Sequence, residues 1–304
     1  MISFSTCWNS SRHSEGAAVI NEIRGIGFDT IEVSHGLKVS LLPGIHKAML
    51  CGDIQISGVH NFCPSPVEVL IDAPDCYEFT SHRSYDRKRA LDLTFATLEN
   101  AASLGAKYAV LHMGSVPMKR ISPKLNALLK QGSGDSRQYV ATKLKLIKKR
   151  KAIARRYLDR AVYALEHIAQ KAEEVGVAVA VESRSAFEDM PNEEEMLMLM
   201  DKFKENPWIG YWHDFGHVQR KHNQGLLDHE QWLATISPHL MGCHLHDVQW
   251  PSRDHRVPLS GNIDYAKLMP YVEAGKPVVW ELSPSCKKSD IKKALPEWIA
   301  RFGS

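Results

Sequence analysis

Short apolar runs alternate with helix-like segments eight times along this chain of 304 residues. The runs are rich in β-branched and aromatic residues, which is typical of buried parallel strands. Strict alternation implies parallel strands joined by right-handed crossovers, and eight such units predict a closed (β/α)8 barrel. The predicted strands lie near 2–6, 28–33, 54–60, 107–112, 177–182, 208–213, 240–245 and 277–282. The predicted helices lie near 14–26, 40–51, 84–104, 138–175, 193–205, 230–236, 264–272 and 288–301.

We therefore expect an α/β protein that folds as a single (β/α)8 TIM barrel domain over residues 1–304. An open doubly wound sheet is the alternative, but it normally carries a glycine-rich phosphate turn after its first strand. Residues 7–16, CWNSSRHSEG, contain no such turn. Two segments exceed a minimal barrel, 61–83 and 113–136, and we expect them to form long loops over the rim that builds a substrate pocket.

The amino-acid composition limits the kinds of partner that we expect for this protein. The 38 basic and 35 acidic residues give a net charge of +3, which is low for a general nucleic-acid binder. No apolar run approaches the roughly 18 residues that span a bilayer, and the amino terminus lacks the basic region and apolar core of a secretory signal. The six cysteines are scattered, as in a reduced cytosolic protein. We expect a cytoplasmic protein without a nucleic-acid or membrane partner, and we leave a homo-oligomer open.

Four successive predicted strands in the second half of the chain end on side chains that can bind a metal ion. Alternate residues of a strand face opposite sides, and the carboxyl ends of barrel strands carry the chemistry, so four inward side chains can surround one point. For any one of them, a helix cap or an arginine partner is the alternative, but four in succession favour a metal. The four are Glu182 in VAVAVES, Asp214 in IGYWHD, His244 in LMGCHLHD and Glu281 in PVVWELS.

Three carboxylates and one imidazole suit one hard or borderline divalent ion. We expect Mn²⁺ or Mg²⁺, with Co²⁺ or Zn²⁺ as alternatives, and no thiolate ligand is needed.

These residues also carry a family resemblance. A glutamate at the end of strand five, Asp214-x-x-His217 after strand six, His244-x-x-Asp247 at strand seven and a glutamate at strand eight resemble the xylose isomerase-like TIM-barrel superfamily. That group includes sugar isomerases, ketose 3-epimerases, inosose and dehydroshikimate dehydratases, and AP endonucleases. The resemblance covers essentially the whole chain, including RDHRVPLSGNIDYAKL after strand seven. One departure is that Ser260 stands where the family turn usually has a second glycine.

The resemblance implies that Glu182, Asp214, His244 and Glu281 bind the metal, and that one or both glutamates move a substrate proton. A metal-bound ketone and hydroxyl acidify the neighbouring C–H bond, and a carboxylate beside that carbon can act as a general base. Return of the proton to the same carbon gives epimerisation, return to the adjacent carbon gives isomerisation, and loss of a hydroxyl gives dehydration. The residues do not separate these reactions.

Other polar residues near strand ends are candidates for contacts with the substrate. His217 fits a partner of a substrate hydroxyl or a support for the metal ligands, with a second-metal ligand or a structural role as alternatives. His246 could replace His244 as the ligand, whereas His213 should face away and be buried. Trp8 could give a sugar an apolar face or pack in the core. The predicted substrate-binding residues are His60, His112, His217, Trp8, Arg184, His246, Arg253 and His255. Glu32, near the end of strand two, is a further candidate for the polar wall of the pocket, and Arg220 and Arg256 lie in the loops after strands six and seven.

We expect a divalent-metal-dependent sugar or polyol isomerase or epimerase whose partner is a small carbohydrate. The alternative is a metal-dependent dehydratase or other lyase on a keto-polyol or a dehydroshikimate-like acid. An AP endonuclease-type phosphodiesterase is disfavoured by the near-neutral charge and by the adjacent Asp254 and His255, which would be spaced in that class. A sugar-binding barrel without activity is disfavoured because a binder has no need of paired bases.

Overall fold

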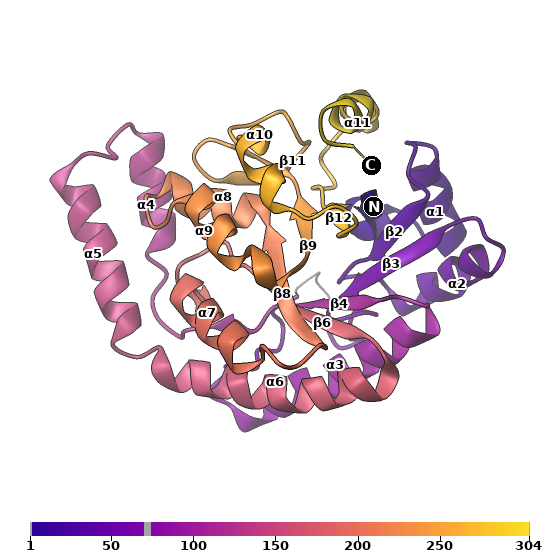
Figure 1. The fold of residues 1–304 in the computed structure, drawn as a ribbon, viewed down its shortest axis with the longest axis horizontal. Coiled ribbons are helices and arrows are strands. Elements are labelled where there is room, and N and C mark those ends of the chain that lie inside the picture. Colours follow the sequence, from indigo (N-terminus) through magenta and orange to yellow (C-terminus); the bar gives the residue numbers. More distant parts are fainter. Residues whose placement is uncertain (1, 70–73, 304) are drawn as a thin grey trace.

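Eight parallel strands close into a barrel, and the helices lie outside it (Figure 1). A computed structural model describes residues 2–69 and 74–303. Around the barrel the strands follow the order β1-β12-β9-β8-β6-β4-β3-β2, and β2 pairs with β1 to close the ring. They are β1 (Ile2–Ser5), β2 (Thr30–Val33), β3 (Gln55–His60), β4 (Tyr108–Leu111), β6 (Ala178–Glu182), β8 (Ile209–Asp214), β9 (Leu240–Leu245) and β12 (Val278–Trp280). The predicted (β/α)8 barrel and its eight strands are confirmed.

The helices cover the outside of the barrel and bury a continuous apolar layer against it. None of the helices in the described ranges is long and apolar enough to cross a bilayer. The α-helices are α1 (Gly16–Arg24), α2 (Leu42–Leu50), α3 (Ser84–Ser103), α4 (Ser122–Lys130), α5 (Arg137–Lys151), α6 (Arg155–Val175), α7 (Glu193–Lys202), α8 (Phe215–Asn223), α9 (His229–Ile236), α10 (Tyr265–Leu268) and α11 (Lys288–Phe302). Short 3-10 turns are Thr6–Trp8, Ser10–Arg12, Val39–Leu41, Ser237–His239 and Met269–Tyr271.

Two short strand pairs lie outside the barrel sheet. One joins β5 (Gly114–Ser115) to β7 (Asp189–Met190), and the other is the hairpin of β10 (Asp247–Gln249) and β11 (Arg253–Arg256). The segment predicted as a loop at 113–136 contains β5 and α4, while 61–69 and 74–83 form neither helix nor strand. Residues 70–73 of that predicted loop lie outside the described residues.

The helix predicted over 138–175 is wrong as a single element. The structure has α5 and α6, separated by three residues, and α5 runs along the outer edge of the molecule with α4 (Figure 1). The interruption contains no Gly or Pro, so local sequence gave no stop signal. Arg150, at the end of α5, is 2% exposed and forms a two-pronged ion pair with Glu195 on α7. This contact holds α5 while the apolar face of α6 packs on the barrel.

A second difference is α8, which sequence analysis did not predict. It begins directly at the end of β8, where the Asp214 side chain accepts a hydrogen bond from the backbone N–H of His217 and caps the helix. Because strand and helix share this residue, there is no turn sequence between them.

Period-two alternation sets the inner and outer faces of the strands. On β8, Tyr211 belongs to the outer layer and Trp212 to an inner cluster with Tyr108, Val110, Ala180 and Val279. Glycine makes room for these inner rings, since a Cβ at Gly58 would lie 2.2 Å from the ring of Tyr108. The inner cluster fills the barrel, and Trp212 lies 5.2 Å from the ring of His244, so it forms the floor of the polar region above it.

Candidate metal centre and active site

Seven barrel strands bring a polar side chain to the inside of its carboxyl end. Each comes from the last residue or two of a strand or from the residue just after it, and all are almost fully buried except His112, which is partly buried. Burying so many ionisable groups is costly unless they pair with one another or bind a metal. The seven are Glu32 (β2), His60 (β3), His112 (after β4), Glu182 (β6), Asp214 (β8), His244 (β9) and Glu281 (after β12).

The four predicted metal ligands converge on one point. His244 Nδ1 lies 3.3 Å from Glu182 Oε1, 3.4 Å from Glu281 Oε2 and 3.8 Å from Asp214 Oδ2. One ligand atom from each of the four residues lies within 4.8 Å of the others. None of the four is more than 3% exposed. The structure therefore brings together the set that the strand ends predicted, although its occupation by a metal stays a prediction.

Glu32 fixes the orientation of His244. Its Oε1 accepts a hydrogen bond from His244 Nε2 at 3.0 Å, and both side chains are fully buried. Because Nε2 is held by Glu32, it is Nδ1 that faces the three carboxylates, where a metal would displace its proton. A carboxylate behind a histidine is the usual arrangement at metal sites, where it fixes the ring tautomer and raises ligand basicity. Sequence analysis placed Glu32 near the pocket but assigned it no partner.

The charges of this cluster fit a divalent cation. Burial opposes ionisation of Glu182 and Glu281, but neighbouring histidines outweigh it and hold the pKa of both glutamates well below the ordinary value. Burial likewise opposes the charged form of His244, yet Glu281, Glu32 and Glu182 raise its pKa well above the ordinary value. Protonated His244 offsets part of the charge of the three ionised carboxylates, and a divalent cation held there would displace its Nδ1 proton and offset that charge instead. Mn²⁺-type and Mg²⁺-type ions prefer this kind of oxygen-rich donor set.

Two further histidines hold Glu182 from the other side. Its Oε2 is 3.1 Å from His60 Nε2 and 2.7 Å from His112 Nε2. His112 Nδ1 is 3.1 Å from Asp75 Oδ1, and Asp75 Oδ2 accepts from Arg184 Nη2 at 2.6 Å. Three of the predicted substrate-binding residues, His60, His112 and Arg184, thus lie in one chain of contacts behind Glu182.

Asp75 was missed by sequence analysis. It lies in the long 61–83 segment, where no strand or helix indicated its direction. Burial opposes its ionisation, but Arg184 and His112 lower its pKa far below the ordinary value. The only signal was the run of Pro and Asp in a loop expected at the rim.

His217 and His246 contact Asp214. His217 Nδ1 lies 3.0 Å from the carbonyl oxygen of Ser183, 3.3 Å from Glu182 Oε1 and 3.4 Å from Asp214 Oδ2. His246 Nδ1 accepts the backbone N–H of His255, so its proton lies on Nε2, which donates to Asp214 at 3.0 Å. Burial lowers the pKa of His246 and keeps it neutral. Because neither of its nitrogens then has a free lone pair, His246 supports Asp214, and His244 is the better ligand.

His255 approaches Glu281 from β11. Its Nε2 lies 3.5 Å from Glu281 Oε2 and its Nδ1 lies 3.4 Å from Asp254 Oδ1. Asp254 in turn pairs with Arg220. Burial opposes protonation of His255, but Asp254 and Glu281 raise its pKa well above the ordinary value. With φ at 53°, His255 occupies the left-handed region that disfavours side chains, so its position is imposed by its contacts.

The turn after β11 depends on one glycine. A Cβ at Gly261 would lie 2.3 Å from Asp247 Oδ1, which instead accepts the backbone N–H groups of Val248 and Ile263. Ser260, which replaces the second family glycine, donates to the carbonyl oxygen of Val257. The close approach therefore requires Gly261, and position 260 tolerates a side chain.

Two predicted substrate-binding residues are not brought to the site. Trp8 is 1% exposed, packs edge-on against Phe4 and donates its Nε1–H to the carbonyl oxygen of Cys286, so core packing is the observed role. The β-strand pattern did not show this, because Trp8 lies in a 3-10 turn after β1. Arg253 is exposed on the β10–β11 hairpin. His213 faces away from the centre, as predicted, and hydrogen-bonds to Tyr211 and His229.

The family and structural comparisons agree with this architecture. The sequence profile of the xylose isomerase-like TIM barrel family matches residues 20–301. A comparison with curated proteins finds no match in sequence.

Three solved structures illustrate the likeness. A D-tagatose 3-epimerase-like protein superposes with a TM-score of 0.69 at 17% identity, over 99% of this chain and 97% of its own. The D-psicose 3-epimerase of Clostridium cellulolyticum H10, solved with D-tagatose, has a TM-score of 0.67 at 14% identity, over 100% and 99%. The IOLI protein, solved with a zinc atom, has a TM-score of 0.66 at 15% identity, over 99% and 97%. At these identities the likeness establishes the fold.

Proposed function

Since this chain belongs to the xylose isomerase-like TIM barrel family, we propose that it is a divalent-metal-dependent sugar or polyol isomerase or epimerase. The observation that carries the proposal is the convergence of Glu182, Asp214, His244 and Glu281 within 4.8 Å inside the carboxyl end of the barrel. The sugar epimerases among its structural neighbours support a small carbohydrate as the substrate class.

The metal would be held by the three carboxylates and by His244 Nδ1, and we propose Mn²⁺ or Mg²⁺. A divalent ion there supplies a Lewis acid that makes the C–H bond beside a bound carbonyl acidic. The protein supplies the fixed geometry, because Glu32 orients His244 and His246 orients Asp214.

Glu182 and Glu281 are the proposed bases. They come from strands that are separated in the barrel by β9 and β8, so they reach His244 from different sides. Both carboxylates are held ionised, as a base that takes a proton from carbon must be. His60 and His112 occupy Oε2 of Glu182, which positions this carboxylate. One glutamate would remove the substrate proton, and the other would return a proton to the opposite face or to the neighbouring carbon.

Exchange of substrate hydrogen with solvent tests this function. Protein loaded with Mn²⁺ and incubated in D₂O with a panel of ketoses and keto-polyols should place deuterium on the carbon beside the carbonyl. Glu182→Gln and Glu281→Gln keep an oxygen donor but cannot take the proton, so each should lower the exchange rate by about 10²-fold or more. Glu22→Gln is the control, because Glu22 pairs with Arg12 and His13 on the outside of the barrel.

Four results would contradict the proposal. An elemental analysis that finds less than about 0.2 ion per chain after soaking in Mn²⁺ would contradict metal binding, since the occupancy of a four-ligand site should approach one ion per chain. A near-normal rate of deuterium exchange in both glutamine variants would contradict the assignment of Glu182 and Glu281 as the bases. Formation of a conjugated enone with loss of water would indicate the dehydratase, and cleavage of an abasic duplex without sugar exchange would indicate the phosphodiesterase.

A further inference from the structure

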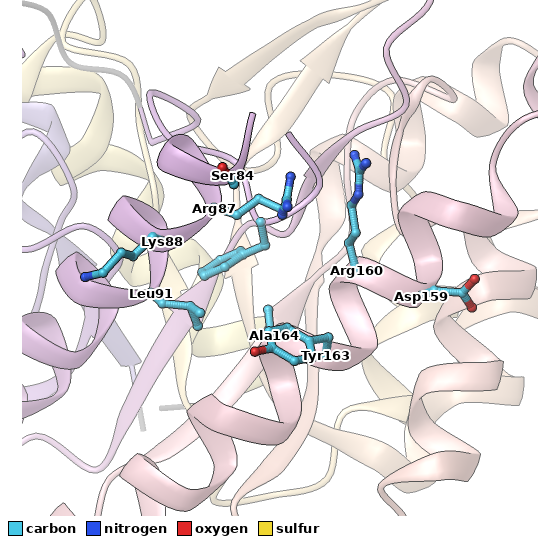
Figure 2. Close-up of a pocket in the computed structure, with 9 residues that line it drawn as sticks. Ser84, Arg87, Lys88, Leu91, Asp159, Arg160, Tyr163 and Ala164 are labelled. Atoms are coloured by element: carbon cyan, nitrogen blue, oxygen red, sulfur yellow. The ribbon is translucent and has the colours of Figure 1, made fainter. Parts of the chain in front are cut away.

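A cavity of about 510 Å³ lies on the outside of the barrel, between α3 and α6 (Figure 2). Its apolar wall is formed by Phe79, Leu91 and Ala164, and the polar groups around it include the hydroxyls of Ser84 and Tyr163. None of the four proposed metal ligands lines it. A volume of this size is typical of sites for small molecules. The cavity is therefore separate from the centre inside the barrel.

Two arginines reach into this region from the two helices. Figure 2 shows the side chain of Arg87 on α3 extending toward that of Arg160 on α6. Arg87 Nη1 donates to the carbonyl oxygen of Ser81 at 2.8 Å, and Arg160 Nη1 donates to the same oxygen at 2.9 Å. Arg160 Nη1 also donates to the carbonyl oxygen of Thr80. The two guanidinium nitrogens therefore cannot be farther apart than the sum of those first two distances.

Within residues 2–69 and 74–303, no carboxylate lies within ion-pair distance of either arginine. Of the acids nearby, Asp86 accepts a hydrogen bond from the hydroxyl of Ser81 at 2.9 Å. Asp159 pairs with Arg155 and points away from α3 (Figure 2). Lys88, which also lines the cavity, already pairs with Asp92. Arg87 and Arg160 are partly buried, so solvent screens their mutual repulsion less than it would on an open surface.

Arg150, which is buried elsewhere in this protein, differs from these two arginines because it has a carboxylate partner. Arg150 donates to both carboxylate oxygens of Glu195 and to a backbone carbonyl, so its charge is balanced within the fold. Within the described residues the hydrogen-bond acceptors of Arg87 and Arg160 are carbonyl oxygens, which carry no net charge, and the ring of Tyr157 lies 5.2 Å from the guanidinium carbon of Arg160. Each arginine keeps further N–H groups beyond the bonds to Ser81 and Thr80. Two like charges held at one oxygen beside a cavity lack the counterion that Arg150 has.

We propose that this cavity is a binding site for a small organic anion, whose phosphate or carboxylate group bridges Arg87 and Arg160 while its apolar part rests on Phe79, Leu91 and Ala164. An anion between two guanidinium groups replaces repulsion with two charge-assisted sets of hydrogen bonds, which are the strong ones. Arginine is suited to this task because its planar fork matches the oxygens of carboxylate and phosphate. The site does not depend on the function proposed for the barrel interior.

The test uses calorimetric titration of the full chain with phenyl phosphate, benzoate, inorganic phosphate and neutral benzyl alcohol. In the wild type, at least one aromatic anion should bind about tenfold or more tightly than benzyl alcohol, because only the anion makes charge-assisted bonds. The better of phenyl phosphate and benzoate identifies the anionic group. If inorganic phosphate binds as tightly as phenyl phosphate, the proposed contact between an apolar part of the ligand and Phe79, Leu91 and Ala164 is wrong.

Variants place the binding in this cavity. Arg87→Gln and Arg160→Gln should each weaken the anion by about tenfold or more, while Lys88→Gln, a neighbouring cation that is already paired, should change the affinity by less than about threefold. If all three variants weaken binding equally, the anion is attracted by general surface charge and the proposed site is wrong. If an arginine variant does not fold, the wild-type preference for anion over benzyl alcohol decides, and equal affinities or no saturable binding overturn the proposal.

Discussion

Replacing Glu32 with glutamine tests the geometry of the metal centre without touching a proposed ligand. Glu32 and His244 are fully buried, and the 3.0 Å contact between them holds Nε2 of His244 on the side away from the carboxylates of the proposed metal ligands. Glutamine has the same length, so the cavity for the side chain is kept. The charge behind the imidazole is lost.

The expected loss follows from this one hydrogen bond. A bond to a charged group contributes about 1.5–3 kcal/mol, and a neutral one about 0.5–1.5 kcal/mol. If the amide oxygen of the glutamine accepts the proton of His244, the difference is about 1–1.5 kcal/mol, or about tenfold in metal affinity. If the amide N–H points at His244 instead, the ring must carry its proton on Nδ1 and cannot act as a ligand. We therefore expect Mn²⁺ to bind Glu32→Gln about 10- to 100-fold more weakly than the wild type.

The assay is a titration of metal-free protein with Mn²⁺, in which free ion is followed by its electron paramagnetic resonance signal. Glu195→Gln is the matched control, because this buried carboxylate pairs with Arg150 away from the centre. It should lower the stability of the protein and leave the Mn²⁺ affinity unchanged. An unaltered dissociation constant in Glu32→Gln would falsify the reasoning, since it would mean that His244 is not the ligand or is not oriented by Glu32.

Further predictions concern stability. Burial lowers the pKa of His213 to about 3, whereas the unfolded chain has about 6.5. The unfolded state therefore takes up the extra proton between these values, and the stability present above pH 6.5 should fall as the pH decreases, by up to about 1.4 kcal/mol per pH unit. The urea midpoints at pH 7.5 and pH 5.5 should differ less in His213→Gln than in the wild type. An equal difference in the two proteins would contradict the role of His213 in this pH dependence. Gly58→Ala should cost about 1–3 kcal/mol in urea denaturation, because its Cβ would lie 2.2 Å from the buried ring of Tyr108; an unchanged midpoint would show that the ring moves freely. Arg150→Met should destabilise the fold by about 3–5 kcal/mol, since it leaves Glu195 buried and unpaired, and Arg150→Met with Glu195→Leu should recover most of this loss if the pair is the cause.

Much of the site followed from strand periodicity. Glu182, Asp214, His244 and Glu281 lie at strand ends, and alternation of side chains placed them on the inner face. The same rule placed His213 outside, where it contacts Tyr211 and His229. These predictions depend only on local backbone geometry, so the sequence was sufficient for them.

The contacts of loop residues were not predictable in the same way. Asp75 lies 109 residues before Arg184 in the chain and yet pairs with it. Trp8 belongs to a 3-10 turn whose direction has no periodic signal. The end of α5 depends on Arg150 and Glu195, which are 45 residues apart.

The amino-acid sequence by itself determined the barrel, the order of its strands along the chain and the identity of the four residues that meet inside it. Hydrophobic periodicity is a local property of the sequence, and in a closed barrel it makes alternate side chains of every strand point toward the same interior. Only the tertiary structure decided which side chain supports which. Glu32 holds His244, His246 holds Asp214, and Arg87 and Arg160 share one carbonyl oxygen with no counterion among the described residues. Those pairings arise from distances between segments far apart in the chain, and they are set by how the packed elements fit together.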